Sequence, residues 1–180
     1  MIPNKMFLTK GSGRHRDKLT SFEQALRNAG IAHLNIVRVS SIFPPACKLI
    51  PREQGLKELA PGEITYAVLS ENATSEPHRL IAASVGVAIP KDPGQHGYLS
   101  EYSSFGENEQ QSGDYAEDLA ASMLATILGI EFDPDASYDI KKDIWKISGK
   151  IVRTRNATQT AIGEKTGLWT AVIAGAVFIP

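Results

Sequence analysis

The run Thr170-Ala171-Val172-Ile173-Ala174-Gly175-Ala176-Val177-Phe178-Ile179 is apolar at nearly every position. A strand that faces solvent on one side alternates apolar and polar residues, and this run does not alternate. Both of its faces therefore need cover from other parts of the chain. The sequence predicts a strand in the middle of a sandwich, which excludes an isolated sheet with one wet face.

The rest of the chain mixes helical and extended patterns. Thr20 and Glu23 form a capping-box pattern before an apolar stripe that ends at Gly30, which predicts a short helix. In residues 116–128, apolar side chains recur at i, i+3 and i+4, which predicts a second helix. Strands are predicted at residues 31–39, 64–69, 78–89, 98–102, 149–160 and 168–179. Two helices and about six strands without regular alternation favour an α+β fold with mainly antiparallel sheets.

Prolines and polar segments punctuate these elements. Pro44, Pro45 and Pro51 predict irregular structure for most of residues 42–53, because proline fixes φ and donates no hydrogen bond. The polar stretch 103–112 is interpreted as a mobile loop or lid. No segment is long enough to act as a linker, so residues 1–180 are expected to form a single domain.

Composition excludes several classes of function. The net charge of -1 over 180 residues argues against a nucleic-acid binder, and no partner of that kind is expected. No apolar run approaches the roughly 20 residues that span a bilayer, and the first residues lack the apolar segment of a signal peptide. The single Cys47 forms no internal disulfide, which fits a reducing, cytoplasmic location. The four histidines lack metal-ligand spacing, so no metal is expected.

The segment Val39-Ser40-Ser41-Ile42-Phe43-Pro44-Pro45 carries the most specific chemistry. If the backbone between the two serines is strained, the hydroxyl of Ser41 can attack the carbonyl of Ser40 and convert the amide into an ester. Elimination then releases the upstream fragment, and hydrolysis leaves a pyruvoyl group at residue 41. Such a carbonyl forms a Schiff base with a substrate amine and acts as an electron sink. The alternative is a strand that ends in an ordinary serine-rich turn before two prolines.

Three further segments resemble a known family when they are combined with this one. They are Gly11-Ser12-Gly13, the helix Thr20-Ser21-Phe22-Glu23-Gln24-Ala25-Leu26, and Gly97-Tyr98-Leu99-Ser100-Glu101-Tyr102. Together with residues 35–45, the pattern resembles the pyruvoyl-dependent arginine decarboxylases along nearly the whole chain. The resemblance implies a four-layer αββα sandwich and conversion of arginine to agmatine and carbon dioxide. It also implies cleavage between Ser40 and Ser41 into a β chain (1–40) and an α chain (41–180), with a homotrimer or hexamer as the assembly.

The resemblance also assigns site residues. Ser41 is the pyruvoyl precursor and Glu101 the proton donor, since a carboxylic acid in apolar surroundings can protonate the carbanion left by decarboxylation. Asn35 assists processing and catalysis. An extended strand would place it roughly 20 Å from Ser41, so either the chain bends sharply or Asn35 reaches the serine of a neighbouring subunit, and we expect the second. By themselves, Asn35 and Glu101 would be ordinary polar strand residues.

Two residues of the first helix are expected to contact the substrate. Glu23 can pair with the guanidinium of arginine through two parallel hydrogen bonds, although the family usually has aspartate here and Glu23 also fits the capping box. Leu19 would line the aliphatic stem of the substrate or simply pack. Other functions stay open: decarboxylation of another amino acid, or an uncleaved relative that binds amines or only forms oligomers.

Overall fold

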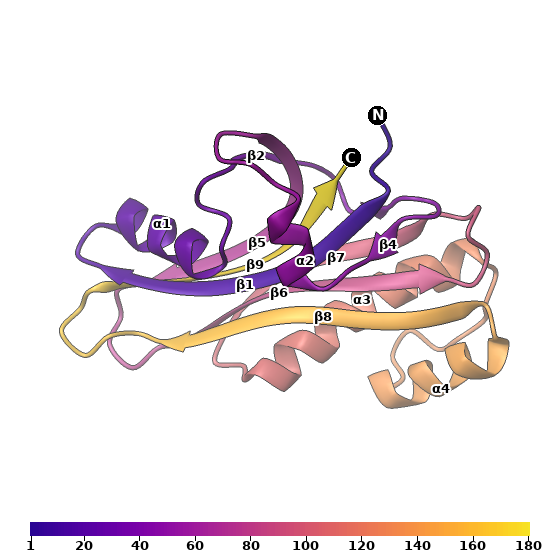
Figure 1. The fold of residues 1–180 in the computed structure, drawn as a ribbon. Coiled ribbons are helices and arrows are strands. Elements are labelled where there is room, and N and C mark those ends of the chain that lie inside the picture. The colour runs from indigo at the N-terminus through magenta and orange to yellow at the C-terminus, as the bar shows by residue number, and fades with distance from the viewer.

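The computed structural model describes residues 1–180, apart from the side chain of Val152. The described chain contains nine strands and four helices (Figure 1). The strands are β1 (Lys5–His15), β2 (Asn35–Arg38), β3 (Ile42–Phe43), β4 (Lys48–Leu49), β5 (Ile64–Thr74), β6 (Leu80–Pro90), β7 (Gly97–Phe105), β8 (Ile151–Ile162) and β9 (Trp169–Ile179). The helices are α1 (Lys18–Asn28), α2 (Arg52–Lys57), α3 (Glu109–Ile127) and α4 (Tyr138–Ser148). None of these helices is both long and apolar enough to cross a bilayer.

The strands form two sheets. Sheet A has the order β2-β5-β9-β1-β4, and sheet B has the order β3-β7-β6-β8. Sheet A is mixed, because β2 pairs with β5 and β4 with β1 in parallel, while its other pairs are antiparallel. Sheet B is antiparallel throughout. The predicted α+β class is confirmed, with one mixed and one antiparallel sheet.

The strand β9 lies at the centre of sheet A and is covered on both faces, as its sequence predicts. Its residues Ala171, Ile173 and Val177 pack in a core cluster that also holds Ala25 and Ala29 of α1. Its alternate residues belong to a second cluster between the two sheets, with Val85 and Val87 of β6 and Leu99 of β7 among their neighbours. The buried side chains of α3 and α4 pack on the outer face of sheet B in a third cluster.

Glycine allows α1 and α3 to approach their sheets closely. A Cβ at Gly11 or Gly13 of β1 would collide with backbone oxygens of α1. A Cβ at Gly86 of β6 would collide with the carbonyl of Ala116 in α3. These glycines explain why β1 was not expected from the sequence: Gly11-Ser12-Gly13 resembles a turn, yet here it is strand that makes room for a helix.

Several other sequence predictions are wrong in detail. The helix α1 begins at Lys18 with Asp17 as its N-cap and no side-chain cap, so Thr20 and Glu23 form no capping box. The predicted strand 31–39 shortens to Asn35–Arg38. The segment 42–53, predicted to be irregular, contains the two-residue strands β3 and β4, and α2 begins at its end with Pro51 as the N-cap.

The predicted lid at residues 103–112 is also wrong. The strand β7 continues to Phe105 and α3 already begins at Glu109. A capping box between Asn108 and Gln111 starts this helix, and only residues 106–108 connect the two elements. The polar residues that suggested a loop are therefore a strand end and a helix cap. The helix α4, whose Trp145 side chain is buried, was not predicted.

Candidate active site

The serine of the proposed cleavage site lies beside the proposed acid. The chain leaves sheet A at the end of β2 and enters sheet B at β3, and Ser41 lies at this crossing. The backbone N–H of Leu99 donates to the carbonyl of Ser41 at 2.8 Å, which anchors the residue next to β7. The Ser41 hydroxyl donates to Oε2 of Glu101 at 3.1 Å. Residues 60 positions apart are thus brought into hydrogen-bond contact.

The carbonyl that would be attacked is held in a tight turn. The N–H of Ile42 donates to the carbonyl oxygen of Ser40 at 3.0 Å, a bond that spans only three residues. One residue earlier, the N–H of Val39 still donates to the carbonyl of Ala67 in sheet A, at 3.1 Å. A donor aimed at the Ser40 oxygen stabilises negative charge that develops there when the carbonyl carbon is attacked.

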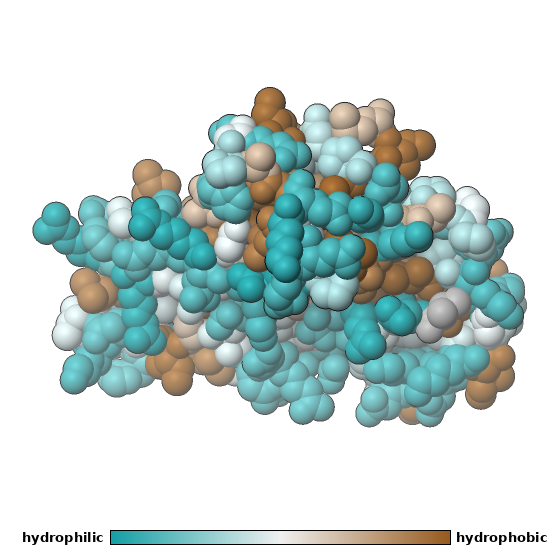
Figure 2. Space-filling view, in the orientation of Figure 1, coloured by the Kyte–Doolittle hydropathy of each residue, from teal (hydrophilic) through white to brown (hydrophobic). Residues whose placement is uncertain are grey.

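An apolar cavity of about 420 Å³ adjoins this turn. Residues from the turn, both chain ends and β5 line it: Met1, Pro3, Val39, Ser40, Ile42, Pro44, Tyr66 and Phe178. Figure 2 shows apolar residues at the surface in the region of β2 in Figure 1 and near the two chain ends. The cleavage site therefore lies at the rim of an apolar surface rather than in open polar solvent.

The remaining predicted site residues lie apart from Ser41 within this chain. Asn35 is exposed on β2, an edge strand of sheet A, and its amide donates to the carbonyl of Gly62 at 2.7 Å. Glu23 accepts a hydrogen bond from Arg27 at 2.6 Å, one helical turn further on. Leu19 is 79% exposed and lines a groove beside α1.

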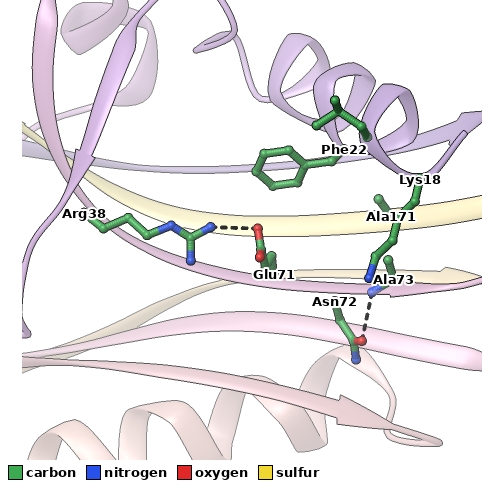
Figure 3. Close-up of a pocket in the computed structure, with 8 residues that line it drawn as sticks. Lys18, Phe22, Arg38, Glu71, Asn72, Ala73 and Ala171 are labelled. Carbon is green, nitrogen blue, oxygen red and sulfur yellow. Dashed lines mark hydrogen bonds and ion pairs between the residues drawn. The ribbon is translucent and has the colours of Figure 1, made fainter.

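That groove holds an ion pair which the sequence analysis missed. Nη2 of Arg38 donates to Oε2 of Glu71 at 2.7 Å (Figure 3). The sequence did contain a signal, because Arg38 is a lone charge in an apolar run three residues before Ser41. Glu71 likewise follows directly on a buried strand segment.

The cysteine near the cleavage site is poorly suited to nucleophilic chemistry. Cys47 is buried in the core between the sheets, and this burial raises the pKa of its thiol to about 11. The thiolate is the nucleophilic form, so a raised pKa leaves Cys47 inert near neutral pH. Among the described residues, no group of three or more histidine, cysteine, aspartate or glutamate side chains is arranged to hold a metal ion.

The site is thus a Ser-Ser turn between two sheets of an α+β fold, with the hydroxyl of Ser41 against the carboxylate of Glu101. Comparison with known proteins specifies the class. The family described as pyruvoyl-dependent arginine decarboxylase matches residues 5–180, and the chain belongs to this family.

Individual relatives agree along their full lengths. The chain is 56% identical to the "Pyruvoyl-dependent arginine decarboxylase" of Nitrosopumilus maritimus and 55% identical to the "Pyruvoyl-dependent arginine decarboxylase 2" of Methanosarcina mazei. It is 59% identical to the "Probable pyruvoyl-dependent arginine decarboxylase" of Chlorobaculum tepidum. Each comparison spans 179 residues, 99% of this chain and 98% of the relative.

Proposed function

We propose that the chain cleaves itself between Ser40 and Ser41 and then decarboxylates arginine to agmatine. The contact between the Ser41 hydroxyl and Glu101 carries this proposal, because it places a proton acceptor on the nucleophile. The family match supplies the substrate class, and the turn at Ser40 supports attack on its carbonyl. The products of cleavage are residues 1–40 and residues 41–180.

Cleavage proceeds in three balanced steps. Oγ of Ser41 bonds to the carbonyl carbon of Ser40 while the amide C–N bond breaks, and the hydroxyl proton ends on the freed nitrogen. Loss of the Ser41 α-proton and rupture of its Cβ–Oγ bond then release the carboxyl end of residues 1–40. Water finally displaces ammonia from the dehydroalanine at position 41 and leaves the pyruvoyl carbonyl.

Residue 41 would hold the pyruvoyl group, which would supply the electron sink that decarboxylation of the substrate amine needs. Glu101 donates the proton that replaces the lost carboxyl group at the α-carbon. Its position beside Ser41 fits this role, because both the amine and the α-carbon must lie within reach of residue 41. Water then releases agmatine and restores the site.

The second set of residues acts at an interface between copies. Asn35 lies on an edge strand of sheet A, and Leu19 and Glu23 lie one turn apart on α1, so all three are available to a neighbouring subunit. We propose a homotrimer, or a hexamer of two trimers, in which Asn35 assists processing and Leu19 and Glu23 contact the substrate. The implied architecture is a single four-layer αββα domain, and the expected location is the cytoplasm.

Denaturing intact-mass measurement of the purified protein tests the proposal. The 19.5 kDa chain should separate into fragments of about 4 and 15 kDa, and the larger should end in a carbonyl that blocks amino-terminal sequencing. Ser41→Ala should stay intact. A wild-type chain that remains whole on prolonged incubation would remove the electron sink and contradict the proposal. Release of carbon dioxide from aspartate but not arginine would retain cleavage and overturn the substrate.

A further inference from the structure

A groove of about 300 Å³ lies where α4 leads into β8 (Figure 1). Four of the residues that line it are basic: Lys142, Lys146, Arg153 and Arg155. The two lysines lie one turn apart on α4, and the two arginines are separated by one residue on β8, so each pair shares a face of its element. Among the described residues that line the groove, none is acidic. The groove therefore concentrates positive charge on a chain whose net charge is -1.

The chain neutralises little of this charge itself. Lys146 pairs with Asp143 at 3.3 Å, and both side chains are largely exposed. Among the described residues, no carboxylate forms an ion pair with Lys142, Arg153 or Arg155. A basic residue in the last turn of a helix offsets the helix dipole, which accounts for Lys146. It does not account for two arginines on the neighbouring strand.

The wall of the groove adds an apolar surface and an unpaired donor. Trp145 and Ile151 belong to the lining, and both pack in the core cluster beneath α4. The indole Nε1 of Trp145 is buried and has no hydrogen-bond acceptor among the described residues. Buried polar groups in proteins are nearly always paired. An unpaired donor in the wall of a cationic groove therefore indicates an acceptor that the chain itself does not supply.

The groove is small and lies apart from the cleavage site. A volume of about 300 Å³ is at the lower limit for ligand pockets, which suits a small molecule. Ile42 pairs with Tyr98 across sheet B, and Tyr98 pairs with Ala88. Ala88 pairs in turn with Thr154, which lines the groove. Three strand spacings of about 4.8 Å thus separate Thr154 from Ile42 by about 14 Å. A small ligand in the groove is beyond hydrogen-bond reach of Ser41.

We infer that this groove binds a small phosphate-bearing molecule, whose phosphate is held by the guanidinium groups of Arg153 and Arg155. A phosphate group carries up to two negative charges, and arginine pairs with it through two parallel hydrogen bonds. Both arginines are exposed, so their side chains are free to turn toward a ligand. Lys142 adds a further positive charge, and the apolar wall contacts the organic part of the ligand. The inference does not rest on the proposed function, because the two sites share no residue.

Calorimetric titration of the purified wild-type protein with inorganic pyrophosphate and with AMP tests the inference. Pyrophosphate reports on charge alone, and AMP adds an organic part. Arg155→Gln should weaken the binding of both by about 10- to 100-fold, because charge-assisted hydrogen bonds are lost. Arg155→Lys should recover part of the affinity, since it keeps the charge without the two parallel bonds. Arg16→Gln removes an exposed arginine outside the groove and should leave both affinities within twofold of wild type.

Fluorescence gives a second readout at the groove itself. The chain has two tryptophans, so Trp169→Phe leaves Trp145 as the only one. AMP should change the emission of Trp145 with the midpoint that calorimetry gives for the same protein. Adding Arg155→Gln to this background should move the midpoint to higher AMP concentration by the factor measured in the calorimeter.

Each other result would overturn the inference. Neither probe would bind at millimolar concentration, or Arg155→Gln would bind both as tightly as wild type. A single-stranded oligonucleotide that binds where AMP and pyrophosphate do not would show a nucleic-acid surface instead. A changed mass of the assembly for Arg155→Gln in ultracentrifugation, with no binding of either probe to wild type, would show that the groove is an interface between copies. None of these measurements depends on self-cleavage or arginine turnover, so the proposed function would stand in every case.

Discussion

Glu101 and Glu117 lie on two elements that pack together, yet their surroundings are opposite. Glu101 is exposed near the middle of β7 and accepts one hydrogen bond, from Ser41 at 3.1 Å. Glu117 on α3 is only 8% exposed and accepts from the Tyr138 hydroxyl and the Asn156 amide, both at 2.7 Å. The carboxylate of Glu101 therefore has unused acceptor sites that face solvent. The carboxylate of Glu117 accepts from residues of two neighbouring elements.

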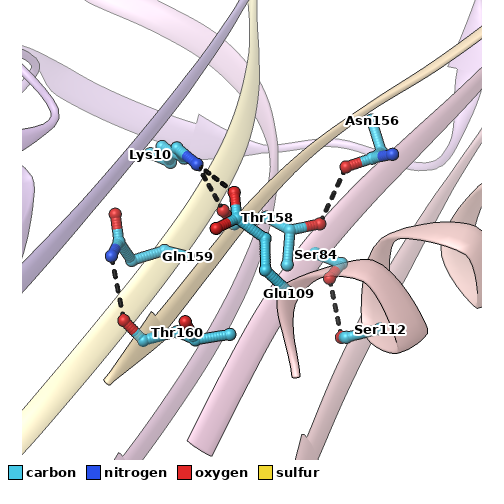
Figure 4. A network of polar contacts seen from close by, with 8 residues as sticks. All are labelled: Lys10, Ser84, Glu109, Ser112, Asn156, Thr158, Gln159 and Thr160. Atoms are coloured by element: carbon cyan, nitrogen blue, oxygen red, sulfur yellow. Dashed lines mark hydrogen bonds and ion pairs between the residues drawn. The ribbon is translucent and has the colours of Figure 1, made fainter. Parts of the chain in front are cut away.

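The contrast extends to the regions around them. Near Glu117, Lys141 forms a buried ion pair with Asp118 at 2.6 Å, and burial raises the pKa of Tyr138, which keeps its hydroxyl protonated as a donor. Figure 4 shows the adjoining network, in which Ser84 contacts Ser112 and Lys10 of β1 reaches Glu109 and β8. These bonds tie α3, α4 and β8 together. The carboxylate of Glu101, by contrast, has a single hydrogen-bond donor among the described residues, the Ser41 hydroxyl.

The largest expected difference between the two glutamates is in catalysis. Glu101→Gln keeps an acceptor for the Ser41 hydroxyl but removes the proton donor, so turnover of arginine by cleaved protein should fall by about 10²- to 10⁴-fold. Glu117→Gln should change turnover by less than about threefold, because its carboxylate serves packing alone. Rates should be normalised to the cleaved fraction from intact-mass data. Equal losses of turnover in the two variants would mean that Glu101 has no greater role in catalysis than Glu117.

The second expected difference is in stability, for which Glu117 should matter more than Glu101. Glu117→Ala leaves the Tyr138 hydroxyl and the Asn156 amide without their acceptor in a buried site. The free energy of unfolding should fall by about 2 to 4 kcal/mol, since each unsatisfied buried group costs about 1 to 3 kcal/mol. Glu101→Ala should change it by less than about 0.5 kcal/mol.

Urea denaturation in the Ser41→Ala background measures both variants on one uncleaved chain at one protein concentration. Glu117→Gln is the finer control, because its amide oxygen still accepts one of the two bonds and should recover part of the loss. A Glu117→Ala protein as stable as its parent would mean that water replaces the carboxylate, and that this region is no more tightly built than the other.

The sequence was informative where local pattern decides structure and failed where partners are remote. The apolar run of β9 and the stripe of α3 needed no other information, and both were predicted. The strand β1 was missed because its glycines serve the approach of α1, which no window along β1 reveals. In the site, the resemblance to a family predicted Ser41 and Glu101 as site residues, and the two side chains are in hydrogen-bond contact in the structure. Arg38 and Glu71 were missed because their pairing depends on the register of β2 beside β5.

The smallest predicted effect concerns Cys47, which lies six residues beyond Ser41 in the same segment. Whereas Ser41 remains accessible, Cys47 packs between the sheets, and its pKa is raised to about 11 from an ordinary value near 9.0. As the pH rises above 9, the unfolded chain loses the thiol proton first. Folding stability from this group is therefore complete below pH 9 and is lost progressively toward pH 11. The free energy of unfolding should fall by about 1 to 2 kcal/mol more for wild type than for Cys47→Ala across this pH range.

Tyrosines and lysines titrate over the same pH range. Because both proteins contain them, their contribution to the free energy of unfolding cancels when wild type and Cys47→Ala are compared in the same buffers. An independent check is thiol alkylation at pH 8, which should be slow for the folded chain and fast in denaturant. Rapid alkylation of the folded protein, together with parallel pH profiles for the two chains, would show that the segment after the cleavage site opens readily. Cys47 would then belong with Ser41 to an accessible segment, and not to the packed core between the sheets.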